Sequence, residues 1–354
     1  MATLVAPVLE EELAPPQTEE ELEERLSQPD AGTVEALTGL EGDFLVLGAG
    51  GKMGLSLTRM LRRALDEGGR QRDTVTAVSR FGGGTGEGFE KAGVETISAD
   101  LLGNGALERL PDAANVLYLA GMKFGSSGDP SATWALNTLL PGLAARRFRR
   151  SRIVALSTGN VYGLVPAGGG GSVETDSLDP AGEYAQSCLG RERLFGYASH
   201  QYGTPTALIR LNYANDLRYG VLVDVAQKVM DGEPVEITMG HVNVIWQGDA
   251  NRAILRAFGH CASPPFLLNV TGLETVSIRW VAQRMAELLD RPQPAITGSE
   301  AETALLSNCT KQHGLFGTPS VALERLVRWT ADWLQRGGRT LGKPTKFQSR
   351  DGRF

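Results

Sequence analysis

Hydrophobic residues in this chain gather in short apolar runs that alternate with amphipathic stretches. Apolar residues 44–47 precede a glycine-rich turn, after which apolar residues recur at helical spacing: Leu55, Leu57, Met60, Leu61 and Leu65. Further runs rich in β-branched residues occupy 74–80, 94–100, 114–121 and 152–159, with helical or glycine-rich segments between them. The alternation predicts an α/β fold of the Rossmann type, a doubly wound parallel sheet with helices on both faces.

Changes in composition and in hydrophobic pattern along the chain predict four regions. Residues 1–41 are acidic and are expected to form an arm that is partly helical or disordered. Residues 42–213 contain the alternating pattern and form the expected Rossmann domain. Residues 214–338 mix helices and short strands, and they predict a smaller mixed lobe, with some elements returning to the Rossmann core, that ends in an amphipathic helix. Residues 339–354 are polar and basic and are expected to form a C-terminal tail.

Composition narrows the classes of function. A formal net charge of -6 argues against nucleic acid as a partner. No apolar run approaches the roughly 20 residues of a spanning helix, and the acidic start lacks the basic region of a signal peptide, so no membrane partner and a cytoplasmic location are expected. Cys188, Cys261 and Cys309 are interpreted as free thiols, and His260 beside Cys261 offers too few ligands for a metal.

The glycine-rich turn is the first feature with chemical meaning. Gly48, Gly51 and Gly54 stand three residues apart between a strand and a helix. Gly48 suits the reversal of the chain, and Gly51 allows the backbone to approach a pyrophosphate closely. Gly54 allows the helix to pack closely against the strand. Free N–H groups at the helix start favour phosphate. The turn, with Lys52 and Met53, therefore predicts dinucleotide binding.

Residues at the ends of the next two strands bear on the choice of cofactor. The second strand ends with Ser79 and Arg80 instead of the acid that would accept from an adenosine ribose. An arginine suits a 2′-phosphate, so NADP is slightly favoured over NAD, although Arg80 could equally be a solvated loop cation. Asp100 and Leu101 close the third strand, and Asp100 either accepts from the adenine or starts a turn.

Several motifs together resemble the extended short-chain dehydrogenase/reductases, in particular the NAD-dependent epimerase/dehydratase family that includes UDP-galactose 4-epimerase. They are the glycine turn, "LAGMKFGSSGDPSATWALN" after the fourth strand, "STGNVYG" after the fifth, "YAQSCLGRE" at the next helix, and "VNVIWQGDANRAI". The resemblance covers most of the chain from about Asp43. It implies a Rossmann lobe that binds NAD(P), a smaller substrate lobe, and a small-molecule substrate such as a sugar, a sugar acid or a nucleotide sugar.

The resemblance also implies roles for individual residues. Ala120 and Gly121 would form a backbone wall along the cofactor, which Lys123 would touch. Asn137 would help to order the active-site helix. Thr158 would hydrogen-bond the reacting oxygen, and Tyr184 would act as general acid/base and contact the cofactor. Glu192 stands where the family often has an acid, and Arg218 is expected to help shape the substrate site. The family also commonly forms homodimers through paired helices that would here include the Tyr184 helix.

Cys188 departs from the family pattern. The family has a lysine four residues after the tyrosine, which stabilises the phenolate and holds the nicotinamide ribose. A free tyrosine has a pKa near 10, so a base at neutral pH needs such a cation, and a thiol cannot supply it. Lys123, or Arg191 two turns beyond Tyr184, is a candidate replacement.

Three interpretations remain open at this stage. The favoured one is an active NAD(P)-dependent oxidoreductase, epimerase or dehydratase with an altered proton-transfer site, because Thr158, Tyr184 and Lys123 are all present. The second is a cofactor-binding protein that has lost catalysis and acts as a sensor or partner subunit. The third gives Cys188 a role as a nucleophile or redox thiol, against the simpler reading that it fills space on the helix.

Overall fold

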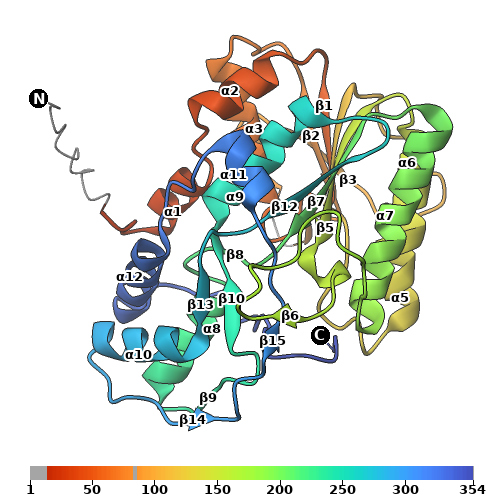
Figure 1. The fold of residues 1–354 in the computed structure, drawn as a ribbon. Helices are drawn as coiled ribbons and strands as arrows, with labels where there is room; N and C mark the ends of the chain where they lie inside the picture. Colours follow the sequence, from red (N-terminus) through yellow and green to blue (C-terminus); the bar gives the residue numbers. More distant parts are fainter. Residues whose placement is uncertain (1–13, 83–85, 354) are drawn as a thin grey trace, which may run out of the picture.

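A seven-stranded parallel sheet forms the centre of the molecule (Figure 1). The computed structural model describes residues 14–82 and 86–353. The strand order is β12-β7-β5-β4-β1-β2-β3. The strands are β1 (Phe44–Leu47), β2 (Val75–Ser79), β3 (Glu95–Ser98), β4 (Asn115–Tyr118), β5 (Arg152–Thr158), β7 (Thr206–Leu211) and β12 (Phe266–Val270). The order reverses between β1 and β4, which is where doubly wound sheets bind ligands. The predicted Rossmann-type fold is confirmed.

Alternate residues of each strand enter two different cores. Phe44 and Val46 pack with α2 (Ala31–Thr38), α3 (Gly54–Glu67), α9 (Gln247–Arg256) and the 3-10 turn η4 (Ala257–His260). Leu45 and Leu47 pack with α6 (Leu140–Arg147) and α7 (Gly182–Tyr202) on the opposite face. Since side chains alternate across a strand, one four-residue apolar run serves both layers. The short helices α4 (Glu87–Glu90), α5 (Pro130–Trp134) and α11 (Thr310–Phe316), the π-helix η2 (Ala135–Leu139) and the 3-10 turn η3 (Gly159–Val161) complete this part.

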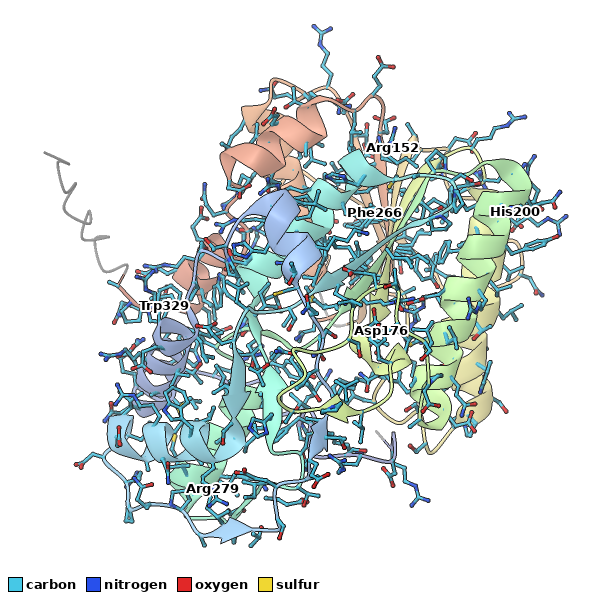
Figure 2. The ribbon with its side chains drawn as sticks, viewed as in Figure 1. Arg152, Asp176, His200, Phe266, Arg279 and Trp329 are labelled. Carbon is cyan, nitrogen blue, oxygen red and sulfur yellow. The ribbon has the colours of Figure 1, made fainter. Side chains whose placement is uncertain are left out.

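A second core lies beside the carboxyl edge of the sheet. It is built by α8 (Val221–Asp231), α10 (Ile278–Leu288) and α12 (Leu323–Gln335). Trp329 of α12, labelled in Figure 2, meets Trp246 edge to face at 5.6 Å between ring centroids. Short strand pairs surround these helices: β6 (Val165–Pro166) with β15 (Thr303–Ala304), β8 (Ala214–Asn215) with β11 (Ile245–Trp246), β9 (Val235–Glu236) with β14 (Ile296–Thr297), and β10 (His241–Asn243) with β13 (Thr275–Ser277).

The described part of the N-terminal arm is integrated into the fold. Helix α1 (Glu19–Leu26) is capped by Thr18, whose hydroxyl accepts from the Glu21 amide. Leu22 and Leu26 are fully buried in the second core, whereas Leu37 of α2 is buried in the Rossmann core. The arm therefore contacts both cores, and the expectation of short helices is met; residues 1–13 lie outside the described part.

The C-terminal segment packs back onto the protein after α12. Thr345 is buried and donates to Asp224 of α8 through both its amide, at 2.8 Å, and its hydroxyl, at 2.5 Å. Phe347 enters the second core. Gly352 lies so close to Gly182 at the start of α7 that a Cβ on either glycine would collide with the backbone of the other segment. The described end of the C-terminal segment therefore lies beside the first turn of α7 (Figure 1).

Candidate active site

The glycine turn between β1 and α3 leaves one glycine that the protein itself does not require. Gly48 has a φ of +84°, and a Cβ there would lie 2.5 Å from the Ala120 amide nitrogen. A Cβ on Gly54 would overlap the Ala49 carbonyl. At Gly51, by contrast, a Cβ would meet only the Gly48 carbonyl oxygen, at 3.5 Å. Because Gly51 is also exposed, the space beside it is free to receive a ligand.

Lys52 and Met53 follow in the turn, and the Lys52 side chain runs away from it toward the second lobe. Its ammonium lies 3.7 Å from the centre of the Tyr219 ring and donates to the Ala214 carbonyl at 3.3 Å. Desolvation by the surrounding protein lowers the pKa of Lys52 to about 7, although the residue is accessible to water. The Met53 side chain is half-buried against the Rossmann core. The turn backbone is thus left to face a ligand.

The residues expected near the adenosine lie at the same edge of the sheet. The Ser79 hydroxyl lies beside the glycine turn, where it would meet a Cβ on Gly50. Arg80 is exposed, and its carbonyl accepts from Ser98 at 3.3 Å. Asp100 is exposed and accepts from the Leu102 amide at 3.1 Å, so it starts a turn, while Leu101 is buried in the core beneath it.

The segment after β4 is tied to helix α7 through Asn137. Asn137 accepts from the Met122 amide and donates to the Met122 carbonyl, both at 2.8 Å, and it donates to Ser187 at 3.0 Å. Ala120 and Gly121 lead into this segment, where Ala120 faces Gly48 and Gly121 is exposed. Lys123 donates to the Thr345 carbonyl at 3.4 Å, and its ammonium lies 5.9 Å from the centre of the Tyr184 ring. Burial lowers the pKa of Lys123 to about 8.

Thr158, Tyr184 and Cys188 come together as expected. Thr158 ends β5, and its hydroxyl accepts from the Asn160 amide at 3.1 Å. Burial and the neighbouring Cys188 thiol raise the pKa of Tyr184, whereas Arg191 and a hydrogen bond with Thr158 lower it. Cys188 is fully buried in a small apolar cluster with Val161 and Tyr162, and burial raises the pKa of its thiol. A buried, protonated thiol is a poor nucleophile, so this environment gives no support to a reactive Cys188.

A buried polar network holds the middle of α7 to the sheet. Arg210 and Glu192 form an ion pair at 2.8 Å, and both side chains are almost completely buried. Glu192 also accepts from Ser157 at 2.6 Å, and Arg210 donates to Tyr162 at 2.8 Å. The acid noted on α7 is therefore fully engaged in fixing the helix next to Thr158.

Arg218 is also engaged, in a different network. Its guanidinium pairs with Asp216 at 2.7 Å and with Glu23 of α1 at 2.7 Å. Arg218 thus links the N-terminal arm to the loop before α8, and its expected contribution to the substrate site stays a prediction.

Two further side chains lie beside Thr158. Asn212 and Ser307 both pack against Gly159. The Asn212 amide nitrogen and the Ser307 hydroxyl are buried and have no hydrogen-bond partner among the residues that the structure describes. Neither Ser307 nor Thr345, whose carbonyl accepts a hydrogen bond from Lys123, was expected near the site from the sequence. Ser307 and Thr345 approach from distant parts of the sequence, so local pattern gives no signal for them.

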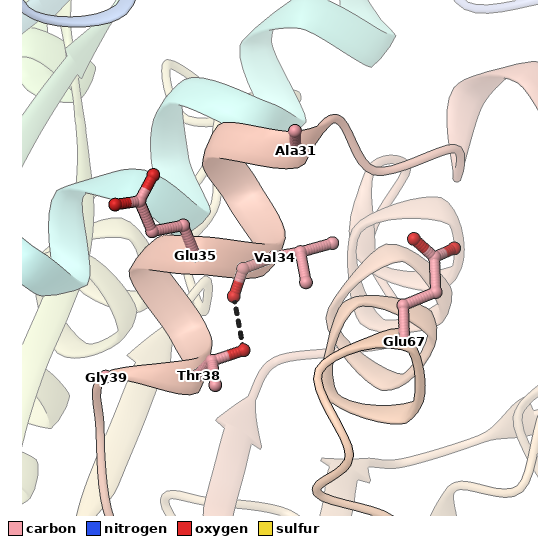
Figure 3. Close-up of a pocket in the computed structure, with 6 residues that line it drawn as sticks. All are labelled: Ala31, Val34, Glu35, Thr38, Gly39 and Glu67. Carbon is pink, nitrogen blue, oxygen red and sulfur yellow. Dashed lines mark hydrogen bonds between the residues drawn. The ribbon is translucent and has the colours of Figure 1, made fainter.

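A surface depression of about 550 Å³ lies elsewhere, between α2 and the end of α3 (Figure 3). It is lined by Ala31, Val34, Glu35, Thr38, Gly39 and Glu67. The Thr38 hydroxyl is already bonded to the Val34 carbonyl at 2.7 Å. Among the described residues its charged lining is the carboxylates of Glu35 and Glu67, and it lies away from the glycine turn, Thr158 and Tyr184, so the sheet edge remains the candidate site. None of the helices in residues 14–82 and 86–353 is long and apolar enough to cross a membrane.

Comparisons with solved structures agree with this fold. The chain is similar to UDP-glucose 4-epimerase from Thermotoga maritima, solved with UDP-glucose, at 18% identity and a TM-score of 0.68. It is similar to UDP-glucose 4-epimerase from Thermus thermophilus, solved with NAD, at 23% identity and a TM-score of 0.66. It is also similar to UDP-glucuronic acid 4-epimerase from Bacillus cereus, solved with UDP-glucuronic acid and NAD, at 17% identity and a TM-score of 0.68. Each match covers 83% of this chain and 99% of the other.

Sequence comparison identifies the family. A search of curated proteins found no match. The model of the NAD dependent epimerase/dehydratase family matches residues 44–261, which is more than half of the chain and includes the glycine turn, Thr158 and Tyr184. The chain therefore belongs to the NAD dependent epimerase/dehydratase family of enzymes.

Proposed function

We propose that this protein is an NAD-dependent enzyme that acts on a nucleotide sugar by hydride transfer at a sugar carbon. In this proposal residues 42–213 hold NAD and residues 214–338 provide most of the sugar nucleotide site. The substrate class rests on the similar structures, which were solved with UDP-glucose or UDP-glucuronic acid. The observation that carries the proposal is that the Thr158 and Tyr184 hydroxyls meet at the sheet edge that also contains the glycine turn.

The residues at this edge fit a dinucleotide. The open space beside Gly51 would receive the pyrophosphate, next to the first turn of α3, where backbone N–H groups and the helix dipole favour an anion. Ala120 and Gly121 would line the nicotinamide side, and Asp100 and Leu101 the adenine side. When bound, NAD supplies a hydride acceptor. The protein itself would supply proton transfer and the positioning of the sugar.

Proton transfer is assigned to Tyr184. The phenolate form of Tyr184 would take a proton from the sugar hydroxyl as the hydride leaves the same carbon, and the tyrosine hydroxyl so formed would return the proton when the hydride comes back. Thr158 would hydrogen-bond the same sugar oxygen and so hold it in line with Tyr184. Because burial raises the pKa of Tyr184, the step depends on a positive charge nearby.

NAD is proposed as the cofactor in preference to NADP. The preference for NADP that Arg80 suggested gains no support from the comparisons, since the family description and the complexes name NAD. Arg80 lies exposed at the end of β2, where it could meet a 2′-phosphate. The affinities of the wild type and of Arg80→Ala for NAD and for NADP, measured by calorimetry, test which cofactor is preferred.

We also propose a homodimer through the outer face of α6 and α7. Five large hydrophobic side chains on this helical layer are exposed: Trp134, Leu139, Leu143, Tyr197 and Tyr202. Such a concentration is typical of a protein interface. Leu143→Glu is expected to yield monomers in light scattering, while Arg72→Glu, an exposed control in the loop between α3 and β2, remains dimeric. A monomeric wild type would contradict the dimer without affecting the assignment of the reaction.

Product analysis tests the proposed reaction. NAD-loaded protein is incubated with a panel of UDP-hexoses and UDP-hexuronic acids, and the sugar products are identified by NMR. Conversion of at least one compound is expected, with a loss of about 100-fold or more in Tyr184→Phe, since general acid/base catalysis is worth about that much. Tight binding of NAD and of a nucleotide sugar without any conversion would instead favour the sensor or partner-subunit alternative.

A further inference from the structure

Helix α7 lacks the family lysine but carries a buried cation one turn later. Arg191 is only 6% exposed. It donates to the Leu156 carbonyl at 2.7 Å and to the Asn137 side-chain oxygen at 2.8 Å. Its guanidinium also lies so near Gly121 that a Cβ there would be 2.5 Å from a terminal nitrogen. The charged group is thus fixed between the ends of β4 and β5 and the first half of α7.

Helix geometry explains how a residue at position 191 reaches this place. Helical side chains lean toward the N-terminus and cover the preceding turn. Arg191 therefore extends back over the turn that contains Cys188, toward Tyr184. The small side chain of Cys188 leaves room for it, whereas a lysine at 188 would bring a second cation into the same space.

Arg191 is unusual because its charge has no carboxylate in contact. Within the described residues it forms no ion pair, and its Nε is buried without a hydrogen-bond partner. Glu192, the adjacent acid, is committed to Arg210. An unpaired buried guanidinium is costly, and mere packing would favour an apolar residue. A phenolate formed at Tyr184 would provide the anionic partner that Arg191 lacks.

We propose that Arg191 is a positioning residue that replaces the missing lysine, with its guanidinium supplying the positive charge that stabilises the Tyr184 phenolate during proton transfer. The inference rests on the proposed function, since it concerns the same tyrosine. Cys188 then has a steric role: it admits the arginine side chain.

The other groups around Tyr184 support this choice. Cys188 lies on the same helix, Lys123 belongs to the loop after β4, and Thr158 ends β5. Lys123 is the alternative cation, but its ammonium faces the Tyr184 ring and is bonded to Thr345. Arg191 lowers the pKa of Tyr184, opposing burial and Cys188, which both raise it.

The test measures ionisation of Tyr184 without any substrate. The protein is labelled with 3-fluorotyrosine, and the Tyr184 signal in a fluorine NMR titration is assigned by its loss in Tyr184→Phe. Arg191→Gln is expected to raise the pKa of Tyr184 by about one unit or more, because a neighbouring cation shifts an acid by that amount. Arg193→Gln, an exposed arginine on the same helix, is expected to leave it unchanged. Cys188→Lys in the Arg191→Gln background is expected to bring the value back.

A second measurement covers the case in which Arg191→Gln does not fold. In wild-type protein with labelled arginine, one guanidinium signal should titrate with the midpoint of Tyr184, and this response should vanish in Tyr184→Phe. An unchanged Tyr184 pKa in folded Arg191→Gln, or the absence of any guanidinium signal that follows Tyr184, overturns the proposal. It is equally overturned if Tyr184 does not ionise in the folded wild-type protein at any pH below the one at which the protein unfolds. Because neither readout uses a nucleotide sugar, a failure here is distinguishable from a failure of the proposed reaction.

Discussion

The three glycines of the phosphate turn differ in what they do. Gly48 and Gly54 are required by contacts within the protein, with the Ala120 backbone and the Ala49 carbonyl respectively. Gly51 has no such contact and faces open space. A side chain at Gly51 would thus obstruct a ligand without disturbing the fold, which separates binding from stability at one position.

This difference gives the first prediction. Gly51→Ala is expected to weaken NAD binding by about 10-fold or more while changing the free energy of unfolding by no more than about 0.5 kcal/mol. Gly54→Ala is expected to destabilise the protein by several kcal/mol, because its Cβ meets backbone that cannot move away. Calorimetry with NAD and urea unfolding measure the two effects. Undiminished NAD binding by Gly51→Ala would contradict the proposed location of the pyrophosphate.

The sequence predicted which hydroxyl side chains meet at the site, but not which cation lies beside them. The meeting of Thr158 and Tyr184 follows from their places at the end of one strand and the start of the next helix. The choice between Lys123 and Arg191 as the cation could not be made from spacing. It depends on Thr345, which holds Lys123, and on Leu156 and Asn137, which hold Arg191.

At the scale of elements, the two terminal segments were the hardest to foresee. The acidic residues of α1 resemble those of a solvated arm, yet Leu22 and Leu26 are buried in the second core. The polar C-terminal segment is held by Asp224, Thr303 and the start of α7, through Thr345, Arg350 and Gly352. Local pattern cannot show such packing, because the partners lie more than 100 residues away for Thr345 and Gly352.

The integration of α1 gives a second prediction. Leu22→Ala is expected to lower the free energy of unfolding by about 2–5 kcal/mol, since it removes a fully buried leucine from the second core. Glu20→Ala, at an exposed position of the same helix, is expected to change it by less than about 0.5 kcal/mol. Urea denaturation compares the two. Equal, small effects would show that the arm is not part of the cooperative unit.

At the scale of the whole molecule, buried weak acids are concentrated around the sheet edge and the loop before α8. Burial raises the pKa values of Tyr118, Tyr184, Tyr213, Tyr219 and Cys188. These groups bind protons more tightly in the folded than in the unfolded state. Lys52 and Lys123, with pKa values of about 7 and about 8, behave in the opposite sense.

These shifts predict a loss of stability at high pH. The buried tyrosines ionise in the unfolded chain near pH 10, so above that pH each contributes a decrease approaching about 1.4 kcal/mol per pH unit until it ionises in the folded state. The lysines raise stability with pH only up to about pH 10.4, where unfolded lysine loses its proton. Urea unfolding at pH 9, 10 and 11 is expected to show a decline above pH 10. Stability that is constant or rising over this range would contradict the burial of these groups.

Tyr118→Phe provides the matched control for that decline. Its hydroxyl is buried and has no hydrogen-bond partner within residues 14–82 and 86–353, so its removal is expected to cost little or no stability at pH 8. The variant should also show a shallower decline above pH 10, because one of the shifted groups is gone.

Reduction of the bound cofactor tests the central claim most directly. Wild-type protein and Tyr184→Phe, both saturated with NAD, are mixed with UDP-glucose or UDP-glucuronic acid, and the absorbance of the reduced nicotinamide is followed. We predict that the wild type shows a rise with at least one of these sugars, and that Tyr184→Phe binds NAD equally well but loses the rise. A wild-type protein that binds both NAD and the nucleotide sugars yet shows no rise and forms no product would contradict the proposed hydride transfer.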